Sequence, residues 1–309
     1  MELAAARKHR QGAQPARTPL HITQVAPSLS STDPLAALLK PCPLMFAIDE
    51  ARLDEFAALC TLATFERNEH VFAEREPSRG LWVLIDGRLR IYHSDLEGRQ
   101  VVIDFPAPHT PLDLAAALDG RPHTVSAIAL QRARLAFFTQ SALAELAQKF
   151  PQTVRNAMRQ LCREYRQRDI SQAVFSFRGA RGRVCCTLLQ LARQYGIHHS
   201  EPGRVKINYL LTRQDLADRS GVTLETAIRV VSDLQRRGVI ATKAQLIEIL
   251  DQGALEMSSE CCACDMDCSV FAKPTVADVQ PLVQAESSGP RGSRVASISP
   301  ASPPSRSSR

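Results

Sequence analysis

The sequence predicts an α+β protein: an antiparallel β-roll, then a long helix, then a smaller helical domain with its own short strands. Three observations support this prediction. Short apolar runs separated by turn residues fill positions 63–138, as in a small barrel or jelly roll. Apolar residues return to helical spacing over 141–175. Further helical patterns, bounded by capping residues and glycine, occupy most of 181–238.

The composition is that of a globular protein with room for more than one domain. The chain has 309 residues, and its formal net charge of +6 is compatible with a nucleic-acid partner. No apolar run is long enough for a membrane helix. The basic N-terminal stretch lacks the apolar core and cleavage site of a secretion signal. We therefore expect a cytoplasmic protein without a membrane partner.

The first half of the chain predicts helices ahead of the roll and then the strands of the roll itself. Helical apolar spacing covers residues 34–62. The strand-like runs include residues 81–92, 99–105 and 132–138. Asp86-Gly87 and Glu97-Gly98 stand between such runs, and both dipeptides are typical of β-hairpin turns. We therefore expect a hairpin at each of them.

A single apolar stripe runs along the long helix. It consists of Val154, Met158, Leu161 and Tyr165. Their steps of four, three and four residues are those of a two-stranded coiled-coil seam, so we expect a second copy of the chain to cover the stripe. The alternative is that the stripe packs on the roll of its own chain. A hinge is expected at residues 176–179.

Residues 211–240 predict two short helices joined by a tight turn, followed by strands of a wing at 239–240 and 246–250. Thr212 is suited to cap the first of these helices, with Asp215 in its first turn. Gly221 stands where the chain turns and takes a positive φ at little cost. Thr223 is suited to cap the second helix. The pattern is that of a helix-turn-helix.

The second helix carries side chains that can read base pairs. Leu224, Glu225, Ile228 and Arg229 begin its outer face. Arg229 can donate two hydrogen bonds to guanine, and Glu225 can accept one from cytosine N4. Leu224 or Ile228 can contact a thymine methyl group. The alternative is a helical hairpin that packs on protein and binds no DNA.

This segment resembles the DNA-binding motif of the Crp/Fnr family of bacterial transcription regulators. The matching positions are Thr212, Arg213, Gln214, Asp215, Gly221, Glu225, Thr226 and Arg229. The resemblance implies a cyclic-nucleotide-binding-type β-roll, a homodimer, a palindromic double-stranded DNA site and RNA polymerase as a partner. It also implies that Thr212 and Arg213 hold DNA phosphate, and Arg236 and Arg237 are candidates for the same role at the far end of the helix.

The resulting division of the chain has six parts. They are a disordered arm (1–33), a β-roll sensor domain (34–140), a dimerisation helix (141–176), a winged helix-turn-helix DNA-binding domain (177–256), a cysteine-rich segment (257–272) and a disordered tail (273–309).

By the same resemblance, the effector pocket of cyclic-AMP-binding relatives corresponds to residues 111–114 and 122–124 of this chain. The residues here depart from the pattern of those relatives. Asp113 stands where those proteins have a glutamate for the ribose, and His123 stands where they have an arginine for the phosphate. Thr124 is kept. A neutral imidazole is a poor substitute for a bidentate cation, so we do not expect cyclic AMP as the effector. His123 could be a haem ligand, but we favour a structural role.

Four cysteines crowd together after the wing: Cys261, Cys262, Cys264 and Cys268. The spacing of Cys261, Cys264 and Cys268 lets thiolates converge from one loop. The fourth ligand is open: Cys262, one of Asp265 and Asp267, or a residue from elsewhere in the chain. A [4Fe–4S] cluster, zinc, a thiol switch and no function are the alternatives. The segment resembles the C-terminal cluster of Fnr proteins from bacilli. The other five cysteines are predicted to be ordinary buried thiols.

The favoured hypothesis is a sequence-specific DNA-binding transcription regulator that responds to oxygen, redox state or another small effector. The alternative is a metal- or ligand-binding redox module that acts through protein partners and keeps a DNA motif without function. We expect no enzyme, because the sequence shows no nucleotide fingerprint, nucleophile elbow or metal-hydrolase helix.

Overall fold

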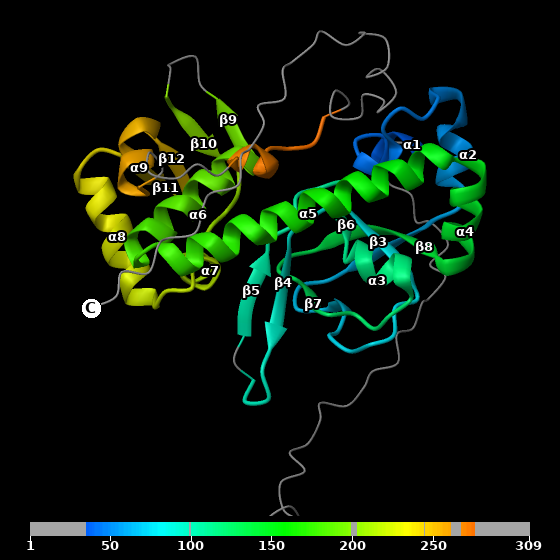
Figure 1. Cartoon of the computed structure of the whole chain (residues 1–309), viewed down its shortest axis with the longest axis horizontal. Helices are drawn as coiled ribbons and strands as arrows, with labels where there is room; N and C mark the ends of the chain where they lie inside the picture. The colour runs from blue at the N-terminus through cyan, green and yellow to red at the C-terminus, as the bar shows by residue number, and fades with distance from the viewer. Residues whose placement is uncertain (1–34, 99, 199–202, 244, 261–266, 276–309) are drawn as a thin grey trace, which may run out of the picture.

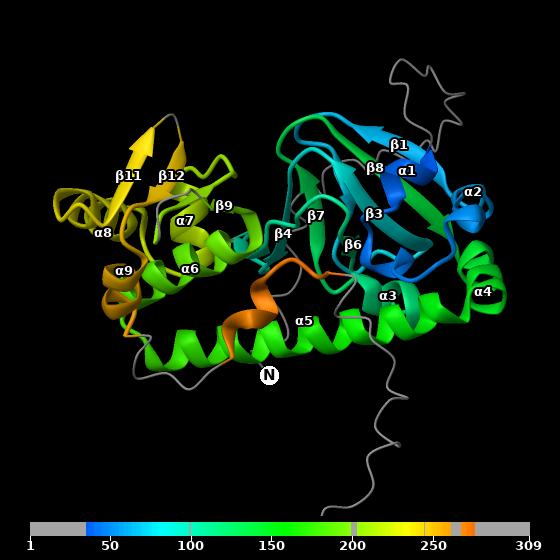
Figure 2. The same cartoon turned by 90° about the horizontal axis from the view of Figure 1, so that it is seen from above.

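The computed structural model describes residues 35–98, 100–198, 203–243, 245–260 and 267–275. Figure 1 shows a β-roll and a smaller lobe of helices and strands, with one long helix, α5, that reaches from one to the other. In the view of Figure 2, α5 runs beneath both. Among these residues, no helix is both long enough and apolar enough to span a membrane.

Short helices precede the roll and close one side of it. They are α1 (Leu35–Leu39), η1 (Pro43–Met45), η2 (Glu50–Arg52) and α2 (Leu53–Ala57). Phe56 of α2 is buried, and its ring meets those of Phe138 and Phe150 edge-on at centroid distances of 5.5 Å. These aromatic contacts fasten the helices to the sheet below them.

The roll consists of two four-stranded sheets in which every pair is antiparallel. One sheet has the order β1 (Thr61–Phe65), β8 (Ala133–Thr139), β3 (Gly80–Asp86), β6 (Pro111–Leu112). The other has the order β2 (His70–Phe72), β7 (Ser126–Ala129), β4 (Leu89–Ser94), β5 (Gln100–Asp104). Leu84, Leu89 and Leu135 are fully buried between them. The predicted α+β class with an antiparallel roll is confirmed.

One of the two predicted hairpins is wrong. Strands β3 and β4 flank Asp86-Gly87 but belong to different sheets, so the chain crosses from one sheet to the other there. Gly87 has φ +98°, and a Cβ on it would lie 2.5 Å from the Cα of Ala133, so the crossing needs glycine for both reasons. Glu97-Gly98 does join the paired strands β4 and β5, as predicted.

The long helical stretch is divided in two. Helix α4 (Gln140–Lys149) ends at Phe150, and α5 (Pro151–Phe177) begins with proline, which suits a first helical turn but ends the preceding helix. The short α3 (Leu114–Asp119) lies near α5. Asn156, on the inner face of α5, donates to the carbonyl oxygens of Leu44 and Phe46. At 1.5 Å per residue, α5 is about 40 Å long.

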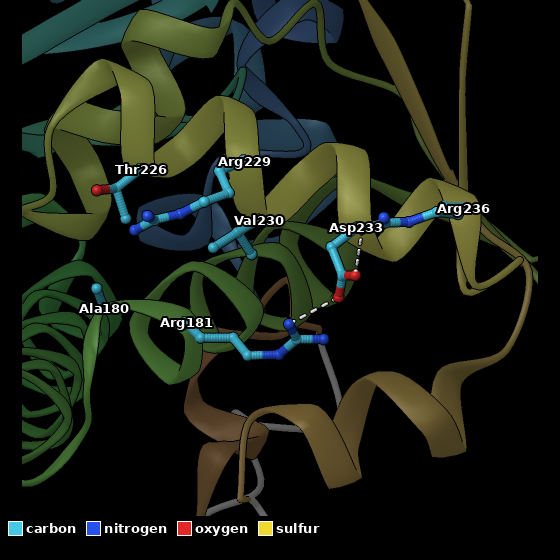
Figure 3. Close-up of a pocket in the computed structure, with 7 residues that line it drawn as sticks. All are labelled: Ala180, Arg181, Thr226, Arg229, Val230, Asp233 and Arg236. Atoms are coloured by element: carbon cyan, nitrogen blue, oxygen red, sulfur yellow. Dashed lines mark hydrogen bonds and ion pairs between the residues drawn. The ribbon is translucent and has the colours of Figure 1, made fainter.

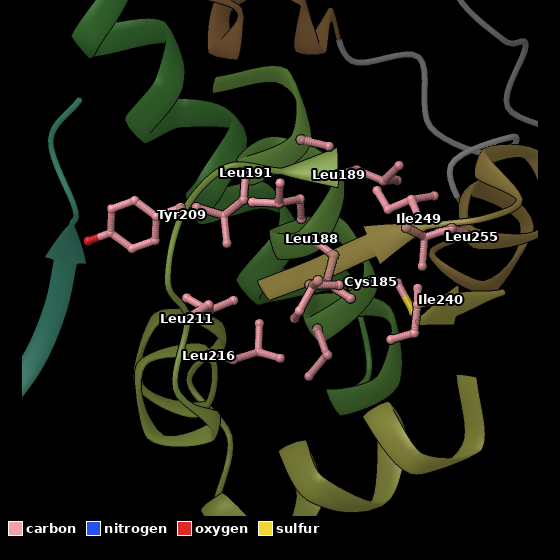
Figure 4. Packing of buried hydrophobic residues seen from close by; sticks show 14 of the residues in the cluster. Cys185, Leu188, Leu189, Leu191, Tyr209, Leu211, Leu216, Ile240, Ile249 and Leu255 are labelled. Carbon is pink, nitrogen blue, oxygen red and sulfur yellow. The ribbon is translucent and has the colours of Figure 1, made fainter. Parts of the chain in front are cut away.

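The second lobe has its own sheet and core. Its elements are α6 (Ala180–Tyr195), β9 (Gly196–His198), β10 (Val205–Ile207), α7 (Arg213–Ser220), α8 (Leu224–Arg236), β11 (Ile240–Lys243), β12 (Leu246–Ile249), α9 (Gln252–Ser258) and η4 (Cys268–Phe271). The sheet order is β11-β12-β10-β9. Figure 4 shows Leu188, Leu216 and Ile249 meeting in this core, and all three are fully buried. Helix α9 was not predicted.

Two segments join the lobes directly. The β4–β5 hairpin lies against α7, and the Tyr195 hydroxyl donates to the carbonyl oxygen of Phe105 just after β5. The segment around η4 returns to α5, where Gln167 Nε2 donates to the Val270 oxygen at 2.6 Å and Arg163 Nη2 to the Ala272 oxygen at 2.8 Å. Figure 2 shows this segment lying along α5 between the lobes.

Candidate nucleic-acid interface

Helix α7 begins with the caps that its sequence predicts. The Thr212 hydroxyl accepts from the Asp215 backbone amide, and the Asp215 carboxylate accepts from the Thr212 amide, both at 3.0 Å. This reciprocal capping box satisfies two otherwise unpaired donors. Arg213, the first residue of α7, is half-buried and donates to the Thr242 hydroxyl of the wing strand β11 at 3.4 Å.

The turn between α7 and α8 requires glycine for two reasons. Gly221 has φ +58°, and a Cβ on it would lie 2.5 Å from the ring of Phe175, near the end of α5. Thr223 then caps α8 by accepting from the Thr226 amide at 3.3 Å. The end of the long helix therefore packs against the turn of the helix-turn-helix.

Helix α8 has one buried face and one exposed face. Ala227, Val230, Val231 and Leu234 are buried in the lobe. The structure places Leu224, Glu225, Ile228 and Arg229 on the exposed face near the start of the helix. Leu224 and Ile228 are 39% and 44% exposed, so both aliphatic side chains reach the surface. The four predicted base-reading residues thus share one accessible surface.

The two arginines predicted to hold phosphate at the far end of α8 lie beside an acidic residue. Arg236 and Arg237 approach the Asp233 carboxylate at 2.7 and 3.9 Å. Gln235 meanwhile donates to the Thr242 hydroxyl at 2.9 Å. Thr242 therefore connects the wing to the end of α8 as well as to the start of α7.

Two of the three residues expected in the effector pocket, Asp113 and His123, bond to each other. His123 Nδ1 lies 2.8 Å from Asp113 Oδ2, and both side chains are almost completely buried. The Phe72 ring stacks on the His123 ring at a centroid distance of 4.1 Å. Thr124, by contrast, is exposed. The positions that would serve ribose and phosphate in relatives instead bond to each other within the fold.

The cysteine predictions are answered only in part. Cys261, Cys262 and Cys264 lie outside the described residues, whereas Cys268 is half-buried in η4. Within the described part of the chain, no three metal-ligating side chains come together. Of the five scattered cysteines, four are buried or half-buried, and burial raises the pKa of the Cys185 thiol to about 12. The prediction is wrong for Cys162, which is exposed because it lies on the outer side of α5.

Sequence reasoning missed a polar cluster between the roll and α7. Arg219 of α7 forms an ion pair with Asp104 at the end of β5. Arg88, the residue before β4, lies over the Tyr209 ring at 4.3 Å, and its guanidinium is 3.9 Å from the Asp215 carboxylate. These groups come from distant parts of the sequence. The residues next to each of them give no sign that it is more than an ordinary surface charge. The cluster places the β4–β5 hairpin next to the capping box.

Comparison with known proteins agrees with this architecture. Residues 62–150 match the cyclic nucleotide-binding domain, and residues 182–257 match the Crp-like helix-turn-helix domain. A CRP-like cAMP-activated global transcriptional regulator of Mycobacterium tuberculosis is 28% identical over 191 residues, 62% of this chain and 84% of that protein. The nitrogen fixation regulation protein FixK of Bradyrhizobium diazoefficiens is 28% identical over 210 residues, 68% and 86% of the two chains.

The solved structures show the same fold. FixK2 from Bradyrhizobium japonicum superposes with a TM-score of 0.57 at 23% identity, over 64% of this chain and 96% of that one. The matched domains, the relatives and the capped helix-turn-helix agree. The chain therefore belongs to the Crp/Fnr family of DNA-binding transcription regulators.

Proposed function

We propose that this regulator acts in the cytoplasm as a homodimer that reads a palindromic DNA site through α8 and works with RNA polymerase. The exposed face of α8 carries the proposal. Arg229 offers a bidentate donor for guanine, Glu225 an acceptor for cytosine, and Leu224 and Ile228 offer apolar contacts for thymine methyl groups. Thr212, Arg213, Arg236 and Arg237 would flank these readers and hold phosphates.

The dimer is supported by the outer side of α5. Val154, Met158 and Tyr165 are 41%, 61% and 69% exposed, at the spacing of a coiled-coil seam, while Leu161 is half-buried. Another face of α5, with Asn156 and Ala157, is buried against its own chain, and Leu161 also packs there. Val154, Met158 and Tyr165 are the part of the stripe that remains accessible to a second copy. A second copy laid along α5 would cover it and set two recognition helices about one DNA turn apart.

The function is tested by selecting a site from randomised duplexes and measuring affinity for the selected and a scrambled sequence. Light scattering on the complex gives its stoichiometry. Two protomers on one palindrome and a strong preference for the selected sequence support the proposal. Equal affinity for both duplexes would contradict specific reading. Absent or salt-independent binding would favour the rival module that acts through protein partners.

For the signal, we propose the cysteine segment rather than a cyclic nucleotide. The mycobacterial relative is named for activation by cAMP, but here Asp113 and His123 bond to each other and are buried. Cys261, Cys264 and Cys268, with Cys262, would supply thiolates for a [4Fe–4S] cluster. The test is the absorption spectrum of protein purified without oxygen, with iron, sulfide and zinc assayed. Equal contents of iron and sulfide would support the cluster. Zinc alone would indicate a zinc site instead, and the absence of both metals would favour a thiol switch.

A further inference from the structure

A hollow of about 380 Å³ lies between α8 and the first turn of α6. Ala180 and Arg181 line it from α6, and Thr226, Arg229, Val230, Asp233 and Arg236 line it from α8. Figure 3 shows Arg181 beneath the recognition helix, reaching up to Asp233, with Arg229 further along the same flank of α8. This hollow borders the base-reading face but includes residues from outside the helix-turn-helix.

Its walls carry more positive than negative charge. Arg181 Nη1 lies 2.7 Å from Asp233 Oδ2, and Arg236 Nη2 lies 2.7 Å from Asp233 Oδ1. The Arg229 guanidinium adds a third cation to the lining. The lining therefore has three guanidinium groups and one carboxylate, which leaves the hollow suited to a further anion.

The arginine from α6 has a donor to spare. Arg181 Nη2 is buried and has no hydrogen-bond acceptor among the described residues. A buried N–H without an acceptor is unfavourable, so a bound anion would relieve it. The hydrogen bond from Arg181 also holds the pKa of Asp233 below its usual range, so Asp233 is ionised at neutral pH.

The location identifies the anion. When a recognition helix lies in the major groove, its flanks face the phosphates that border the groove. Residues 226, 229, 233 and 236 follow one another at steps of three and four along such a flank of α8. A phosphodiester of the DNA backbone is the anion that this position would meet.

We propose that the hollow is a backbone-phosphate site in which Arg181 is a ligand and Asp233 competes with the phosphate for the arginines. The proposal rests on the DNA binding proposed above. In free protein Asp233 holds Arg181 and Arg236 in position. On DNA its charge opposes the phosphate and lowers affinity for every sequence. Asp233 therefore lowers the affinity for DNA of any sequence, independently of the bases that α8 reads.

The experiment measures the salt dependence of binding to fluorescein-labelled duplexes, one selected and one scrambled, by anisotropy. Arg181→Ala is expected to weaken binding to both duplexes by the same factor. It should also reduce the magnitude of the slope of log K against log salt by about 0.9, the value for one phosphate contact. Arg181→Lys, which keeps the charge, should retain the slope. Arg121→Ala removes an equal charge from an 85%-exposed side chain of the roll and should change nothing.

Asp233→Asn completes the test, because it keeps the shape of the side chain and removes its charge. It should tighten binding to both duplexes. An unchanged slope in folded Arg181→Ala would overturn the phosphate site. Unchanged or weaker binding by Asp233→Asn would overturn the competition and leave Asp233 as a scaffold. If wild-type protein binds neither duplex, it is the proposed function itself that fails.

Discussion

Arg219 and Asp104 lie 115 positions apart in the sequence and form an ion pair between α7 and the end of β5. The Arg219 side chain is only 9% exposed, whereas that of Asp104 is 38% exposed. The pair is therefore the most direct charged contact described between the roll and the helix that carries the capping box. A movement of the β4–β5 hairpin would therefore displace or strain α7 through this ion pair.

The unequal burial predicts unequal effects of breaking the pair. Asp104→Ala leaves Arg219 buried without a partner and should destabilise the protein by about 3 kcal/mol. Arg219→Ala leaves Asp104 free to hydrate and should destabilise it less, by about 1 kcal/mol. Urea unfolding at one protein concentration compares them, and the double variant gives the coupling. Equal losses would contradict the deeper burial of Arg219.

Gly221 should tolerate alanine less well than Gly238. Both have positive φ, +58° and +71°, so each alanine carries a conformational penalty of about 1 kcal/mol. At Gly221 the added Cβ would also meet Phe175, whereas no atom of the described residues lies within 4 Å of the position at Gly238. The melting temperature of Gly221→Ala should fall further than that of Gly238→Ala, and Phe175→Leu should recover part of the difference. Matching losses would mean that α5 does not press on the turn.

Arg229→Ala should relax the preference at one base pair of each half-site and weaken specific binding by about 1–3 kcal/mol. The reason is the loss of a bidentate pair with guanine. Competition against duplexes that vary one position at a time measures both effects. Ser232→Ala, on the same exposed face, is the control. A uniform loss across all sequences would reassign Arg229 to the backbone.

Glu164 predicts a pH dependence of stability. Burial raises the pKa of its carboxyl above the usual value, so the folded state binds that proton more tightly than the unfolded state. Stability from this group is present at low pH and is lost as pH rises through the raised pKa. Glu164→Gln should therefore raise the melting temperature at neutral pH, with a gain that vanishes toward pH 4. The exposed Glu50→Gln should show no such trend.

Cyclic AMP should not stabilise the protein. Asp113 and His123 already bond to each other at 2.8 Å, and the Phe72 ring stacks on the His123 ring. Thermal denaturation with and without millimolar cyclic AMP tests this, with cyclic GMP as a second ligand. A saturable rise in melting temperature would show that the pair opens to admit a nucleotide.

Local patterns predicted the elements whose causes are local. The capping box at Thr212 and the stripe on α5 depend on residues within a few positions of each other, so spacing alone revealed them. Asp86-Gly87 misled because the dipeptide signals a sharp turn without saying which sheet the next strand joins. Asp104 with Arg219, and Arg181 with Asp233, had no local signal at all, because only the packing of distant elements brings each pair together.

The segment around η4 places a second demand on α5. One side of this helix is available to a partner, while Arg163 and Gln167 on another side donate to the backbone of residues 270 and 272. Each face therefore evolves under its own constraint. A homologous chain that ended at the wing would lack this backbone, so positions 163 and 167 would lose that constraint. In this lineage, the two positions and the segment that they hold should change together.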